Sequence, residues 1–147
     1  MGPVPRATGK ELHMNVFVVE GPNRPGELAR MAEALAAGGI NILPYGIGGG
    51  SGRWAAAVVA SDEEASRSAL TAAGIAHREF PVLYVRMEDV PGQAAAASRK
   101  LAAAGINIEL WLPVDTSKEG FTVAVAVDDV EAAQEVLGDQ LTDWSYA

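Results

Sequence analysis

Cysteine is absent from the 147 residues, and histidine occurs only at His13 and His77. Without cysteine there can be no disulfide framework and no thiolate metal site, which agrees with a reducing compartment. Two histidines that are isolated in the sequence do not provide the ligand pattern of a zinc or iron site. We therefore expect neither a bound metal nor a cofactor.

Basic residues are also scarce, since 11 Lys and Arg stand against 19 Asp and Glu and give a formal net charge of −8. Without a stripe of Lys and Arg the chain cannot neutralise phosphates, so nucleic acid is not an expected partner. No window approaches the roughly 18 uninterrupted apolar residues of a membrane span, and the N-terminus lacks the apolar region of a signal peptide. The composition predicts a soluble cytoplasmic protein that does not bind membranes.

One stretch occurs twice, because Pro91 follows Pro25 by 66 residues and Asn107 follows Asn41 by the same 66. The first copy reads Asn23-Arg24-Pro25-Gly26-Glu27-Leu28 and then Gly39-Ile40-Asn41-Ile42, and the second reads Asp89-Val90-Pro91-Gly92-Gln93 and then Gly105-Ile106-Asn107-Ile108. This duplication predicts two small folding units, 14–80 and 81–147, after a loose tail at 1–13. Units of that size are marginal alone, so we expect them to share a packed interface.

Apolar periodicity and turn residues predict the same order of elements in both copies. In the first copy we expect strands at 15–20, 40–47, 53–60 and 75–80, a helix from Pro25 to Gly38, and a helix from a Ser61–Glu64 capping box to Gly74. In the second copy we expect strands at 82–87, 106–112, 121–127 and 142–146, and helices at 91–104 and 128–137.

The order strand, helix, strand, strand, helix, strand predicts an α+β protein in which each unit has an antiparallel four-stranded sheet with both helices on one face. Pro44 removes a donor from the second strand, which places that strand at an edge or on a bulge. The glycines at 48–52 lie between two strands, a context that favours a flexible hairpin over a phosphate-binding loop.

The repeated turn carries the chemistry that the sequence offers. Gly26 and Gly92 fall in the first helical turn, where glycine is unfavourable unless a backbone, a side chain or a ligand approaches closely. The helix N-terminus behind each glycine suits a carboxylate. Asn23 and Asp89 can either cap the helix or bind a ligand's ammonium group.

The two strand-initial asparagines, Asn41 and Asn107, leave the same two interpretations open. Their amides can hold a ligand's carboxylate and ammonium groups, or they can fix a neighbouring loop. Tyr45 and Trp111, four residues farther on, either border a ligand or pack across strands.

Asn/Asp-x-Pro-Gly, an amphipathic helix and then Gly-Ile-Asn-Ile resemble the ACT domain, a small amino-acid-binding regulatory module of ferredoxin-like βαββαβ fold. The resemblance covers both copies. It implies that the two ferredoxin-like sheets lie side by side as one eight-stranded sheet with the helices on one face, and that ligands bind between units, held by the first loop of one and the second strand of its neighbour. The residues that it marks as ligand-binding are Asn23, Arg24, Pro25, Gly26, Glu27, Leu28, Asn41, Ile42, Asp89, Val90, Pro91, Gly92, Asn107 and Ile108.

The resulting hypothesis is a non-catalytic regulatory module that binds a small amino acid at the interface between ACT units. We expect a homodimer or a higher homo-oligomer, and any regulated metabolic enzyme or regulator would be a separate chain. No pair of nucleophile and base is evident, so we do not expect an enzyme. The alternative hypothesis is a ligand-free assembly module that acts through the edges of its sheets.

Overall fold

The structure, a computed structural model, describes residues 15–144, except for the side chains of residues 43 and 44. The tail expected at 1–13 and the end of the last expected strand lie outside this range. In the first unit, strands β1 (Asn15–Pro22), β2 (Ile42–Gly50), β3 (Arg53–Ala60) and β4 (His77–Pro81) form an antiparallel sheet in the order β2-β3-β1-β4. Helices α1 (Glu27–Ala37) and α2 (Glu63–Ala72) connect these strands.

The second unit repeats this order with one strand fewer. Its sheet runs β5-β7-β6 and consists of β5 (Leu83–Met87), β6 (Ile108–Ser117) and β7 (Gly120–Val127), with helices α3 (Gln93–Ala103) and α4 (Val130–Leu137). The last predicted strand is wrong over its described part, 142–144. A short 3-10 helix, η1 (Gly138–Gln140), precedes it, and in the part of the chain that the structure describes Leu141 makes an isolated bridge to Val85 of β5.

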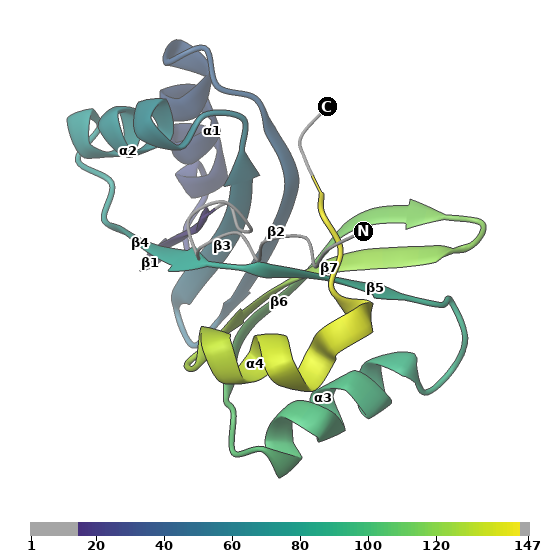
Figure 1. The fold of residues 1–147 in the computed structure, drawn as a ribbon. Helices are drawn as coiled ribbons and strands as arrows, with labels where there is room; N and C mark the ends of the chain where they lie inside the picture. The colour runs from purple at the N-terminus through teal and green to yellow at the C-terminus, as the bar shows by residue number, and fades with distance from the viewer. Residues whose placement is uncertain (1–14, 145–147) are drawn as a thin grey trace.

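Alternating side chains on the strands separate two faces of each sheet. On β1, Phe17 and Val19 pack beneath Met31 and Leu35 of α1, whereas Val16 points to the opposite face. The second unit has the same division, with Leu101 of its first helix buried over its own sheet. Each helix pair thus covers one face of its own sheet, which confirms the α+β architecture of two ferredoxin-like units (Figure 1).

The two sheets pack face to face and do not join side by side into one eight-stranded sheet. Their uncovered faces share an apolar core, in which Val16 and Val59 of the first sheet meet Tyr84 and Ala126 of the second. These strands carry apolar side chains on both faces of the sheet. The face that the helices leave uncovered must therefore be buried against another sheet and not exposed to solvent. The helix pairs consequently lie on the two outer sides of the molecule, as Figure 1 shows with α1 and α2 above the sheets and α3 and α4 below.

Glycine permits this close approach at one point, because a Cβ on Gly46 of β2 would lie 3.2 Å from Cδ1 of Leu112 on β6. The units are also joined covalently with little slack, since only Val82 separates β4 from β5. Strand β2 is an edge strand with a register shift between Ile42 and Tyr45, which confirms both structural consequences predicted from Pro44.

Helix starts differ from the sequence-based expectation in two ways. Gly26 and Gly92 precede their helices and do not lie in the first turn; both have left-handed backbones, with φ of 94° and 96°. This conformation explains glycine without any close neighbour. The second helix is capped by Asp62, whose side chain accepts from the amide of Ala65, because Ser61 lies one residue too early.

Within residues 15–144, no helix is long and apolar enough to cross a membrane, and no group of three or more His, Asp or Glu could hold a metal ion.

Candidate functional site

The turn before α1 presents backbone donors that have no partner within the described chain. The amide of Arg30 bonds to Gly26 and that of Glu27 makes a long bond of 3.4 Å to Arg24, which leaves the amides of Leu28 and Ala29 without a bond among the described residues. No side chain caps this helix, so Asn23 does not serve as its cap. The turn therefore offers two N–H groups and the positive end of the helix dipole to an anion.

A carboxylate lies beside these donors. Nε of Arg24 donates to Oε1 of Glu27 at 2.7 Å, and the Glu27 side chain is only 11% exposed. The other oxygen of Glu27 and Nε1 of Trp54 both lie beside Gly21 of β1, where a Cβ would be 3.8 and 3.1 Å away from them. Nε1 of Trp54 is buried and makes no hydrogen bond, an uncommon state for an indole donor.

Asn23 is held over the end of β2. Its backbone amide donates to the carbonyl of Gly52 at 2.9 Å, and its side-chain Nδ2 lies 2.8 Å from the position that a Cβ on Gly49 would occupy. Only glycine fits beneath the Asn23 side-chain amide, so packing explains why residue 49 is a glycine. The hairpin expected at 48–52 is present, but its turn is confined to Ser51 and Gly52, because Gly48 to Gly50 belong to β2 and Gly50 pairs with Arg53 of β3.

These groups line one depression of about 590 Å³, which we name the turn pocket. Leu28 and Ile47, 37% and 46% exposed, are large apolar side chains on its border. The pocket is thus apolar on one side and has donors and a carboxylate on the other, which is typical of small-molecule sites. Its lining comprises Asn23, Arg24, Gly26, Glu27, Leu28, Ala29, Ile47, Gly48, Gly49 and Trp54.

Solved structures with this fold include a protein of Bacteroides thetaiotaomicron, with a TM-score of 0.76 and 21% identity over 90% of this chain and 93% of that one. The regulatory subunit of aspartate kinase from Thermus thermophilus matches with a TM-score of 0.61 and 22% identity over 88% of this chain and 93% of that one. Aspartate kinase of Clostridium acetobutylicum matches with a TM-score of 0.59 and 14% identity over 87% of this chain and 33% of that one. The chain has the tandem ACT-domain fold. No protein-family model matches it, and neither does any curated protein.

The structure gathers only part of the predicted set at the turn pocket of the first ACT unit. Five of the expected residues line it: Asn23, Arg24, Gly26, Glu27 and Leu28. Asn41 and Ile42 lie at the opposite end of β2, because Ile42 pairs with Ala60 whereas Gly50 pairs with Arg53. Eight residues of extended strand put Asn41 about 27 Å from Gly49 within one chain.

The strand-initial asparagines are anchored through their backbones. The amide of Asn41 donates to Oγ of Ser61 at 3.3 Å, and its carbonyl accepts from the Ser61 amide. The amide of Asn107 donates to Asp128 at 2.9 Å, and its side chain donates to Glu109 at 2.9 Å. The side chain of Asn41 makes no hydrogen bond among the described residues, so it is free to contact a ligand.

The second ACT unit keeps the turn but replaces the groups around it. The strand pairing puts Phe121 in place of Trp54, because Met87 pairs with Phe121 as Gly21 pairs with Trp54. At the start of the helix, Gln93 takes the place of Glu27. The indole donor and the carboxylate are therefore lost. Asp89, Val90, Pro91 and Gly92 are exposed, and Ile108 packs against the second core.

The two matched aromatic residues do not line the turn pocket. Tyr45 is 44% exposed on β2 opposite Val58, and Trp111 packs against the core of the second unit. Ile47, Gly49 and Trp54 were missed as site residues. The glycine run and a tryptophan at the head of the next strand were the available signals, but a sequence does not show which side chains lie beneath the helix start.

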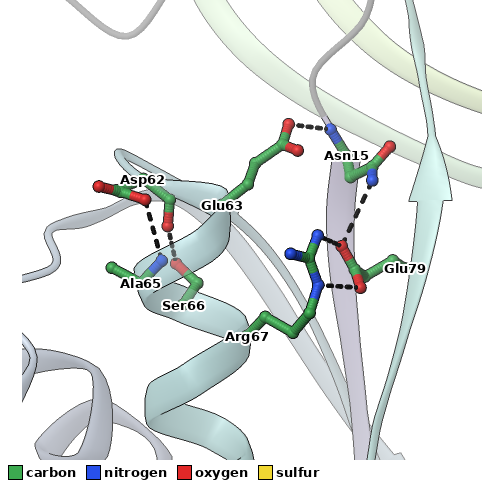
Figure 2. A network of polar contacts seen from close by, with 7 residues as sticks. All are labelled: Asn15, Asp62, Glu63, Ala65, Ser66, Arg67 and Glu79. Carbon is green, nitrogen blue, oxygen red and sulfur yellow. Dashed lines mark hydrogen bonds and ion pairs between the residues drawn. The ribbon is translucent and has the colours of Figure 1, made fainter. Parts of the chain in front are cut away.

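Titratable groups elsewhere serve structural roles. Arg67 of α2 donates to both oxygens of Glu79 on β4 at 2.8 and 2.6 Å, and Glu63 accepts from the amide of Asn15 (Figure 2). The hydrogen bond from Arg67 lowers the pKa of Glu79 and also raises the pKa of Arg67. This network fixes α2 to the sheet and presents no paired nucleophile and base.

Proposed function

We propose that this chain is a non-catalytic regulatory module that binds a small amino acid at the interface between ACT units. The observation that carries the proposal is the turn pocket, where two unpartnered amides, the Glu27 carboxylate and an unpartnered Trp54 donor surround one depression. Donors and an acceptor so close together suit a zwitterion, which carries both charges on neighbouring atoms.

The pocket suggests one orientation for such a ligand. The ligand's carboxylate would accept from the amides of Leu28 and Ala29 at the helix N-terminus. Its ammonium group would lie near Glu27 and the side-chain oxygen of Asn23. A side chain of the ligand would then contact Leu28 and Ile47, which favours an aliphatic amino acid. A few charge-assisted bonds and one buried aliphatic group suffice for micromolar affinity, about −8 kcal/mol.

The rest of the site would come from a second copy of the chain. Strand β2 is a sheet edge, and antiparallel pairing of two β2 edges about Gly46, the centre of the strand, would align each Asn41 with Ser51 of the other copy. In such a dimer, Asn41 of one copy would lie beside the turn pocket of the other copy, so its side-chain amide could contact the ligand there. It also covers Tyr45 and Ile47, whose exposure on an edge strand is otherwise a liability.

The fold neighbours support a regulatory role. One is described as a regulatory subunit of aspartate kinase and another as an allosteric aspartate kinase. By analogy, ligand binding here would change how the chain associates with itself or with a separate metabolic enzyme in the cytoplasm. The second candidate function is an assembly module that binds no ligand. The apolar β2 edge favours it, and so does the second turn, which lacks the carboxylate and the indole donor of the first.

A thermal-shift panel of the common amino acids at millimolar concentration tests the proposal. A ligand at one hundred times its dissociation constant adds about 2.7 kcal/mol, or about 5–10 °C for a chain of this size. Asn23→Ala and Asn41→Ala should each weaken binding about tenfold, because each removes one hydrogen-bonding amide. Asp89→Ala in the second turn is the matched control and should leave affinity unchanged.

Analytical ultracentrifugation separates the two candidate functions. A ligand-binding module shows a thermal shift with at least one amino acid and a dimer that responds to it. A dimer that forms without any amino-acid response would favour the assembly module. Binding that survives in both Asn23→Ala and Asn41→Ala would reject the site while leaving the regulatory role intact.

A further inference from the structure

A second depression lies between the two sheets, on the faces that the helices do not cover. It has a volume of about 450 Å³, within the range of small-molecule sites. We name it the inter-sheet pocket. Its lining comprises Val18, Glu20, Gly46, Ile47, Gly48, Ala55, Ala56, Ala57, Arg78, Phe80, Glu109, Leu110, Trp111 and Leu112.

Small residues on neighbouring strands create this space. Gly46 pairs with Ala57, and Gly48 pairs with Ala55, so four minimal side chains form one continuous floor. Leu112 of β6 closes the inner end, where it contacts Gly46 and is buried. Toward Gly48 no side chain occupies the gap, because a Cβ there would meet nothing within 4 Å.

The outer end of the pocket is charged. Arg78 donates to Glu20 at 2.6 Å and lies over the ring of Phe80, with its guanidinium carbon 5.3 Å from the ring centre. Glu109 of β6 faces the same pocket and accepts from Asn107. The lining of the pocket therefore carries two carboxylates against one guanidinium, which is a net negative charge. Arg53 lies farther along β3, where it lines an adjoining depression instead.

We propose that the inter-sheet pocket binds a small organic cation with an aromatic or bulky aliphatic body. The body lies on the glycine and alanine floor beneath Leu110 and Leu112, and the ammonium group stays at the outer end beside Glu109 and Glu20. Burial of the apolar body provides the affinity, and the carboxylates select the sign of the ligand's charge. The net charge of −8 on the whole chain also favours the approach of a cation.

This site lies on the other side of β2 from the turn pocket, and Ile47 and Gly48 border both. Strand β2 divides the two, since Tyr45 and Ile47 share the helix-covered side with Trp54, whereas the floor glycines point the other way. A ligand between the sheets touches both ACT units, so it would stabilise their relative orientation. Binding between the sheets would not require an amino acid at the turn pocket.

Two indole probes with the same ring and two-carbon linker but opposite charge test the proposal. Tryptamine should bind saturably to the full chain, with a dissociation constant about tenfold lower than that of indole-3-propionate. Methyl NMR should show the largest shifts at Ala57 and Leu112, with no change at Leu28. Ala55→Leu, which fills an exposed part of the floor, should weaken tryptamine binding at least fivefold.

Glu109→Gln should also weaken tryptamine binding at least fivefold and reduce the preference over indole-3-propionate. Glu119→Gln is the matched control, because it removes the same charge from the exposed turn after β6. Absence of saturable tryptamine binding, equal affinity for both probes, or shifts at Leu28 without shifts at Ala57 and Leu112 would each overturn the proposal. An unfolded Ala55→Leu variant would leave the Glu109→Gln comparison and the NMR map to decide.

Discussion

Replacement of Tyr84 by phenylalanine tests how tightly the two sheets are packed. The Tyr84 ring lies in the core between the sheets, 2% exposed and 5.4 Å from the ring of Trp144. Its hydroxyl is buried and has no hydrogen-bond partner. Desolvation by burial, with a smaller contribution from Glu63, raises the pKa of this phenol from 10.0 to about 12.

The raised pKa of Tyr84 determines how the stability of the fold depends on pH. Because the folded-state pKa is the higher one, the unfolded chain loses its phenol proton first as the pH rises. The stability associated with the neutral phenol is complete below pH 10 and is lost as the pH rises to about 12. A shift of two units at about 1.36 kcal/mol each gives a loss of at most about 2.7 kcal/mol.

Urea unfolding of the wild type and Tyr84→Phe at pH 7 and at several values between pH 10 and 12 measures this loss. At pH 7 the variant should be as stable as the wild type or about 1 kcal/mol more stable, because it removes an unpartnered buried hydroxyl. At pH 12 it should lose about 2 kcal/mol less than the wild type. Tyr45→Phe is the control, since Tyr45 is 44% exposed. Equal alkaline losses in the wild type and Tyr84→Phe would refute the reasoning.

Three further perturbations address other parts of the molecule. Gly120→Ala should destabilise by on the order of 3 kcal/mol in urea unfolding, because φ is 153° and a Cβ would lie only 2.2 Å from the carbonyl oxygen of Met87; a loss below about 1 kcal/mol would contradict this. Since Arg67 lowers the pKa of Glu79, the stability from this pair is present above the usual carboxyl range and is lost as the pH falls, so Glu79→Gln should flatten the acid side of the stability curve. If the wild type and Glu79→Gln lose the same stability at acid pH, the Arg67–Glu79 pair is not the cause of that loss. Trp54→Phe should keep the fold, as judged by circular dichroism, while it weakens amino-acid binding at the turn pocket about tenfold in calorimetry.

The duplication made the architecture predictable from sequence. Constant spacing between Pro25 and Pro91 marked two equal units, and apolar periodicity located the four α-helices and the seven strands of the described chain. The helix starts were harder to predict. The same sequence is compatible with a left-handed Gly26 before the helix and with a helical Gly26 in its first turn. The last strand was predicted wrongly over 142–144, where the described chain has no strand and an isolated bridge between Leu141 and Val85 follows η1.

Packing between the units could not be predicted from the pattern within each unit. Strands such as β1 are apolar on both faces, which indicates that both faces are buried but does not say by what. The family resemblance suggested sheets joined at their edges, whereas the small side chains of Gly46, Ala57 and Ala124 allow the faces to meet. The same limitation affected the site, since Trp54 reaches the helix start through sheet pairing that a linear sequence does not display.

The face-to-face arrangement also restricts how copies of the chain can assemble. Both sheets keep one long edge, β2 and β6, but the two edges differ. Strand β6 contains Pro113, two register shifts and the exposed acids Glu109 and Asp115, which are features that oppose edge pairing. Strand β2 pairs in unbroken register from Tyr45 onward and exposes apolar side chains. Pairing through β2 alone is isologous and therefore closes after two copies. We expect a dimer with two equivalent turn pockets, each completed by Asn41 of the other copy, rather than an open chain of molecules.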